Sequence, residues 1–178
     1  MKKVLILQIV LCALLLTACG ETKEEFNETT VSVGKKGEVT EYIISAFDKD
    51  YYKEDELKNM VTKTIDEYNQ SIGEENVKLS DFVLSEDGNI HVTTDYNSSA
   101  DYTTMNGRDL FTGTVAEAKS AGYGVSADES FTDEDKIIIS IEAVQVHVPS
   151  KIKAVSSGAQ MVTDYTAKLP GQMGYVIY

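Results

Sequence analysis

Residues 54–96 read EDELKNMVTKTIDEYNQSIGEENVKLSDFVLSEDGNIHVTTDY, a helical pattern followed by two strand patterns. Three acidic residues open the helical part, where the positive end of the helix dipole favours negative charge. Beyond them, apolar side chains recur every three or four residues and so share one helix face. These side chains are Leu57, Val61, Ile65, Tyr68 and Ile72. Gly73 provides a C-terminal stop, so we predict one long helix with an apolar face.

The second part of this stretch predicts a β-hairpin. Residues 77–84 and 89–96 favour strands, and the connection between them contains Asp87-Gly88. An Asp-Gly pair between two such runs is a strong hairpin signal, because both residues accept the backbone angles of a tight turn. The helix and the hairpin together predict a helix packed on an antiparallel sheet.

The rest of the chain adds strands and one short helix. Further strands are expected at residues 30–33, 39–47, 136–148, 151–156, 160–166 and 173–178. The apolar phase shifts near Ala143, as a bulge would cause. Thr114 and Glu117 form a capping box that opens a short helix. Hairpins dominate, so we predict an α+β fold: a mainly antiparallel sheet of hairpins with one long helix packed on it and one short helix.

Residues 97–113 predict a long irregular connection. Structureless connections of this length are uncommon and often functional. The segment contains Tyr102 and Arg108, the single arginine of the sequence. A guanidinium can bind a carboxylate with two parallel hydrogen bonds, which an ammonium cannot do. Arg108 therefore either fixes an internal aspartate and orders the loop, or binds a carboxylate of a ligand or partner. Tyr102 and Arg108 are the candidate ligand-binding residues.

The N-terminus has the pattern of a secretory signal. Two lysines precede an apolar run at residues 4–16, which is too short to span a bilayer. The run leads into Leu16-Thr17-Ala18-Cys19, which resembles the lipobox of bacterial lipoproteins. This resemblance implies cleavage before Cys19 and lipidation of its thiol. It also implies a protein held by its lipid on the extracytoplasmic face of the cell membrane.

This interpretation divides the chain into a signal peptide at residues 1–18, a lipid-anchored tether at 19–29 and a single globular α+β domain at 30–178. Asp50-Tyr51-Tyr52 ahead of the long helix, and the helix start at residues 113–118, are similar to those of small uncharacterised lipoproteins of gut-type Firmicutes. The resemblance implies a location and adds no site residues, because that family has no activity to transfer.

Charge and cysteine content limit the function classes. The formal net charge is −13, and it becomes −15 when the two lysines of the signal peptide are removed. So acidic a surface repels nucleic acid, and we expect no nucleic-acid partner. Cys12 falls in the signal peptide and Cys19 would carry lipid. The mature chain is therefore expected to lack a thiol for a disulfide, a zinc site or nucleophilic catalysis.

No catalytic or metal-binding pattern is recognisable. The two histidines, His91 and His147, each lie between apolar neighbours, so we expect both on the polar face of a strand. Asp95 shares the face of His91, but two groups are too few for a zinc site. Residues 122–127 fit the letters of a dinucleotide motif, yet a helix precedes them and an acidic loop follows, the reverse of what that motif requires. We expect no catalytic residues, no metal and no cofactor.

These observations favour a non-enzymatic binding or interaction module on the cell surface. Its partners would be the membrane, through the lipid anchor, and an unknown protein, glycan or small molecule. Two alternatives stay open. A small-solute-binding lipoprotein requires a deep pocket, and a cell-envelope hydrolase requires His91, Asp95 and other carboxylates to converge in one cleft.

Overall fold

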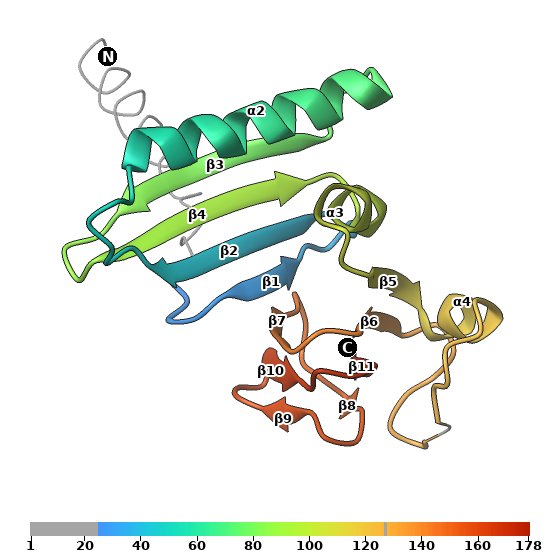
Figure 1. The fold of residues 1–178 in the computed structure, drawn as a ribbon. Helices are drawn as coiled ribbons and strands as arrows, with labels where there is room; N and C mark the ends of the chain where they lie inside the picture. Colours follow the sequence, from blue (N-terminus) through green and yellow to red (C-terminus); the bar gives the residue numbers. More distant parts are fainter. Residues whose placement is uncertain (1–24, 127) are drawn as a thin grey trace, which may run out of the picture.

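The computed structural model describes residues 25–126 and 128–178. This part of the chain forms two β-sheets and three helices (Figure 1). The helices are α2 (Glu54–Ile72), α3 (Ser99–Asn106) and α4 (Val115–Ser120). The predicted α+β class is confirmed, with the long helix α2 over one end of the larger sheet.

The larger sheet has the strand order β3-β4-β2-β1-β7-β10-β9, and the smaller sheet has the order β5-β6-β11-β8. The strands of the larger sheet are β1 (Thr30–Val33), β2 (Val39–Ala46), β3 (Val77–Leu84), β4 (Asn89–Tyr96), β7 (Val144–His147), β9 (Gln160–Met161) and β10 (Thr166–Leu169). Those of the smaller sheet are β5 (Leu110–Thr114), β6 (Lys136–Ser140), β8 (Ala154–Val155) and β11 (Gly174–Ile177). In the described chain, β1 pairs with β7 in parallel and the other pairs are antiparallel.

The hairpin of β3 and β4 has the strand limits that the sequence predicts. Its register shifts between Leu79 and Asp81, and this bulge was not predicted from the sequence. Strand β4 also pairs along its whole length with β2, and this second pairing sets Ile43 opposite Val92 and Glu41 opposite Thr94. These four side chains share the sheet face on the side of α2, because side chains alternate between the two faces of a strand.

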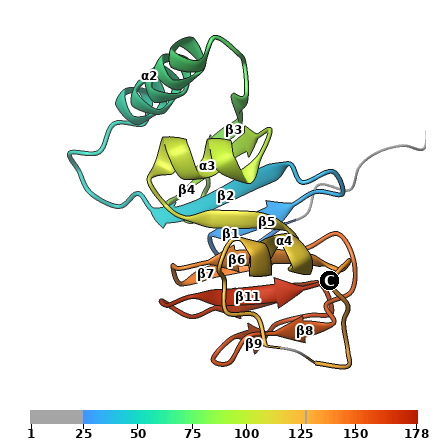
Figure 2. The same cartoon turned by 90° about the vertical axis from the view of Figure 1, so that its right-hand side faces the viewer.

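The two sheets lie next to each other (Figure 2), and one hydrophobic core joins them. Val31 and Val146 of the larger sheet belong to the same buried cluster as Ile138 and Val176 of the smaller sheet. Helix α4 covers a second cluster on the smaller sheet. The capping box predicted at its start is confirmed, with Glu117 donating its backbone N–H to the Thr114 hydroxyl.

The single bulged strand predicted over residues 136–148 is wrong. The structure has two strands there, β6 in the smaller sheet and β7 in the larger sheet. Residues 141–143 turn the chain from one sheet to the other. The shift in apolar phase near Ala143 therefore marks a change of sheet, which gives the same sequence pattern as a bulge.

The long irregular connection predicted at residues 97–113 is also wrong, because this segment contains α3 and β5. The Ser98 hydroxyl accepts the backbone N–H of Asp101 and so caps the start of α3. Gly107 ends the helix in the left-handed region, with φ 63°. This helix could not be predicted from the sequence, because Tyr102 and Met105 are the only large apolar side chains among its eight residues. Two such residues do not define a helical period.

The polypeptide contacts the sheet before the predicted domain start at residue 30. The ring centroid of Phe26 lies 4.9 Å from that of Tyr42 and 5.5 Å from that of His147. Glu28 forms an ion pair with Lys168 at 2.8 Å. Phe26 and Glu28, which the sequence assigned to the tether, thus contact the larger sheet.

The predicted signal peptide and Cys19 lie outside the described residues. Within residues 25–126 and 128–178, none of the helices combines the length and the apolar character that crossing a bilayer requires.

Candidate binding groove

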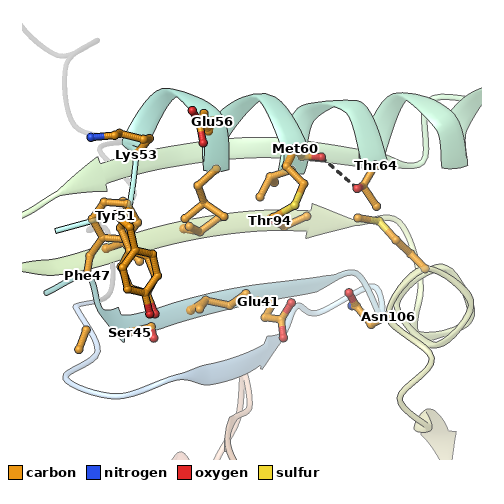
Figure 3. Close-up of a pocket in the computed structure, with 18 of the residues that line it drawn as sticks. Glu41, Ser45, Phe47, Tyr51, Lys53, Glu56, Met60, Thr64, Thr94 and Asn106 are labelled. Carbon is orange, nitrogen blue, oxygen red and sulfur yellow. Dashed lines mark hydrogen bonds between the residues drawn. The ribbon is translucent and has the colours of Figure 1, made fainter. Parts of the chain in front are cut away.

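A groove of about 710 Å³ runs between α2 and the face of strands β2 and β4 that lies on the side of this helix (Figure 3). Alternation along the two strands supplies its floor, which includes Ile43, Val92 and Thr94. Leu57 and Met60 of α2 form part of its wall. Most of the lining is therefore apolar, as in sites that bind small organic molecules. We call this feature the groove.

The groove exists because α2 packs on β3 more than on the neighbouring strands. Ile65 is the buried residue of the helix, with 5% of its surface exposed. Nearer the start of the helix, Leu57 and Val61 are only half-buried, and Met60 is 60% exposed. The apolar face predicted from the sequence thus packs on the sheet in part, while its first turns line an open channel.

The two ends of the groove differ in character. At one end lie Phe47, Tyr51 and Tyr52, in which neighbouring rings have centroids 5.0 Å apart. Helix α3 contributes Met105 and Asn106 to the other end. Ile90 and Tyr96 of β4 both line the groove, and at about 3.3 Å per residue it therefore extends for about 20 Å.

A buried carboxylate marks the α3 end. Glu41 is 2% exposed, and three donors bind it. Its Oε1 accepts from Nη1 of Arg108 at 3.2 Å and from the Tyr102 hydroxyl at 3.3 Å. Its Oε2 accepts from the Tyr96 hydroxyl at 3.2 Å. We call these four residues the Glu41 network. A buried charge is tolerated when it is paired and hydrogen-bonded in this way.

The protonation states in the network follow from burial. Burial raises the pKa of Glu41 above its ordinary value, although the Arg108 guanidinium opposes that rise. Burial, with the charge of Glu41 adding to it, raises the pKa of Tyr102 to about 12 and also raises the pKa of Tyr96. Both phenols therefore keep their protons at neutral pH and act as donors. With three donors already bound, Glu41 is placed to organise the fold rather than to accept a proton from a substrate.

The two residues singled out in the sequence, Tyr102 and Arg108, meet at Glu41. Neither lines the groove, but both contact Glu41, which does, and the ring of Tyr102 also packs against that of Tyr96 with their centroids 5.2 Å apart. Arg108 forms an internal clamp, but with glutamates: besides Glu41 it contacts Glu142, with Nε and Oε2 3.5 Å apart. The aspartate expected as its partner is therefore wrong, because the pairing joins segments that are far apart in the sequence.

Glu41 was not among the residues predicted from the sequence, although its position in the strand indicates a special role. The residues Val39, Glu41 and Ile43 share one face of a predicted strand. A carboxylate between two apolar residues on the same strand face indicates a buried acid that requires a cation or several donors.

His91 and Asp95 lie on the opposite face of the sheet from the groove. Their neighbours on the other face, such as Val92 and Thr94, are buried, as alternation predicts. His91 lines a hollow of about 320 Å³ together with Phe26. The carboxylate of Asp95 accepts from the Thr40 hydroxyl at 2.8 Å and from the Ser80 hydroxyl. The sheet thus separates these two residues from Glu41, and the three groups do not share a cleft.

The described residues contain no group of three or more histidine, cysteine, aspartate or glutamate side chains that could hold a metal ion. Comparison of the chain with protein-family models, with curated proteins and with solved structures finds no match.

Proposed function

We propose that the protein is a lipid-anchored, non-enzymatic binding module on the extracytoplasmic face of the membrane, and that its ligand occupies the groove. The observation that carries the proposal is the groove itself, whose volume of about 710 Å³ lies in the usual range of small-molecule sites. Most of its lining area is apolar, and polar side chains such as Ser45, Thr94 and Asn106 lie among the apolar ones. This supports the small-molecule class among the partners that the sequence left open.

Exposed apolar side chains on the lining of the groove favour the binding of an apolar ligand. Met60 is 60% exposed and Tyr51 is 73% exposed, and both lie on its lining. An apolar ligand would remove these surfaces from water, which is favourable in proportion to the area covered. The hydrolase alternative has less support, because His91 and Asp95 lie across the sheet from the groove.

The anchor part of the proposal predicts a loss of membrane attachment on Cys19→Ala. Without the thiol no lipid can be added, and a stable attachment requires more than one acyl chain. Cells labelled with a radioactive fatty acid should incorporate label into the wild-type chain and none into the variant. Cys12→Ala is the matched control, because it lies in the predicted signal peptide and should leave labelling unchanged. Equal labelling of Cys19→Ala and wild type would refute the lipobox interpretation.

The binding part predicts that a ligand protects Met60 from a reagent in water. A thiol introduced by Met60→Cys in membrane-bound full-length protein can be titrated with an impermeant maleimide. Envelope extract should slow this labelling by about tenfold when the ligand is in about tenfold excess over its Kd. Val162→Cys is the control, because Val162 is 49% exposed and follows β9 at the other edge of the larger sheet. Equal slowing at both positions, or none at Met60, would contradict a ligand in the groove.

A further inference from the structure

We infer that the groove takes a single hydrocarbon chain, such as the acyl chain of a fatty acid or of a lysolipid; this inference rests on the proposed function. Four properties of the groove support it: the pairing of its floor strands, the absence of net charge in its interior, its dimensions, and the difference between its two ends.

The backbone around the groove offers few groups to a peptide. Strand β4 pairs with β2 and β3, and β2 pairs with β4 along its length and with β1 over residues 39–42. Beyond its first turn, the wall helix bonds its own backbone groups to each other. An extended peptide in this channel would lose hydrogen bonds to water and gain few in return. A hydrocarbon chain has no such groups to satisfy.

The interior of the groove also presents no net charge to a ligand. The carboxylate of Glu41 is compensated by Arg108 at 3.2 Å. The other charged lining residues, Lys53 and Glu56, are exposed at the rim, and the ammonium of Lys53 points away from the channel in Figure 3. A charged ligand inside would lose hydration without a counter-charge, whereas an uncharged apolar chain would not.

The dimensions favour a thin, elongated ligand. The groove offers about 710 Å³ over a length of about 20 Å, so it is long for its width. A single extended chain can lie along the floor from Ile90 to Tyr96, in contact with Leu57 and Met60 on one side.

The difference between the two ends of the groove sets the orientation of the hydrocarbon chain. Helix α3 stands across the end near Glu41, where the donors of the Glu41 network are already engaged. Tyr51 and Tyr52 lie at the open end, and a tyrosine presents an apolar ring together with a polar tip. The methyl end of the chain therefore lies towards α3, and the polar head emerges beside Tyr51, 73% exposed to water.

A chain-length series tests this inference with the Met60→Cys protein in membranes. Saturated fatty acids and lysophosphatidylcholines with eight to eighteen carbons are each added below their micellar concentrations. The concentration of compound that halves the labelling rate should fall by about fourfold per added methylene. It should stop falling once the chain fills the groove. Both series should show this plateau, and any difference between them reports the contribution of the head group. Val162→Cys should keep its labelling rate throughout.

The outcomes separate this inference from the proposed function. If envelope extract protects Met60→Cys but no alkyl compound does so with a dependence on chain length, the hydrocarbon assignment is overturned and the groove keeps its role as a binding site. If neither extract nor alkyl compounds protect the thiol, both proposals fall. Chain-length-dependent protection without a plateau, shared by Val162→Cys, would show partition into the membrane and would overturn the hydrocarbon assignment as well.

Discussion

Arg108→Ala should lower the free energy of unfolding by about 2 kcal/mol near neutral pH. The substitution leaves Glu41, only 2% exposed, without its cationic partner. Removing one member of a buried pair typically costs about 3–5 kcal/mol, but Arg108 itself is half-exposed and water can enter its place, so we expect a smaller loss. The two tyrosine donors would remain on the carboxylate.

The stability lost in Arg108→Ala should increase with pH. Burial already raises the pKa of Glu41, and the loss of Arg108 should raise it further, since the guanidinium opposes the effect of burial. A carboxyl whose pKa is raised in the folded state stabilises the fold at low pH, and that stabilisation is lost as pH rises through the folded pKa. Arg108→Ala should therefore be nearly neutral at about pH 4, where Glu41 is protonated in both proteins, and costly at about pH 7.5.

Urea unfolding of the full-length protein, followed by circular dichroism at the two pH values, measures this difference. Glu142→Ala is the matched control, because it removes the exposed partner of Arg108 and should change the stability by less than about 0.5 kcal/mol. Adding Glu41→Gln to Arg108→Ala should restore much of the lost stability, since no buried charge is left unpaired. The same loss at both pH values would show that Arg108 acts through packing rather than through the charge of Glu41.

Ile65→Ala should cost about 3 kcal/mol, the usual range for removing most of a buried isoleucine side chain. Ile65 is the buried residue of α2 and belongs to the core that joins the sheets. Val61→Ala, one turn earlier on the same face, should cost less than about 1.5 kcal/mol because Val61 is only half-buried and borders the groove. The contrast tests whether the helix rests on the sheet near Ile65 and stands away from it nearer its start.

Chemical unfolding of the two variants gives both values from their transition midpoints, provided that the denaturant dependence is unchanged. Equal costs at the two positions would mean that α2 packs evenly along its length. An even packing would close the groove, so this result would weaken the binding proposal as well.

Elements with a strong local signal could be predicted from the sequence. The alternation in β3 and β4 and the Asp-Gly turn between them gave both strand limits, and the apolar period gave α2. Helix α3 and strand β5 lack such a period, so residues 97–113 were predicted as a loop. Local patterns also could not distinguish a bulge near Ala143 from a passage between two sheets, since both shift the apolar phase by one residue.

The site was harder to predict than the fold because it depends on tertiary placement. The apolar face of α2 was evident, but its offset over β3 was not, and this offset creates the groove. Tyr102 and Arg108 were predicted from the sequence as candidate ligand-binding residues, and in the structure both bind the same buried carboxylate. Their shared contact, Glu41, lies more than sixty residues earlier in the chain. No local pattern encodes such a pairing, although the position of Glu41 on an apolar strand face signalled that it needed partners.

Two adjacent isoleucines test whether a ligand lies between α2 and strands β2 and β4. Ile43 lines the groove, whereas Ile44 points to the opposite face of the sheet, and both are half-buried. Ile43→Trp and Ile44→Trp therefore add the same bulk on opposite sides of one strand. In the Met60→Cys background, envelope extract should no longer slow maleimide labelling in Ile43→Trp and should still slow it in Ile44→Trp. Equal protection in the two variants would show that the ligand does not lie in the groove.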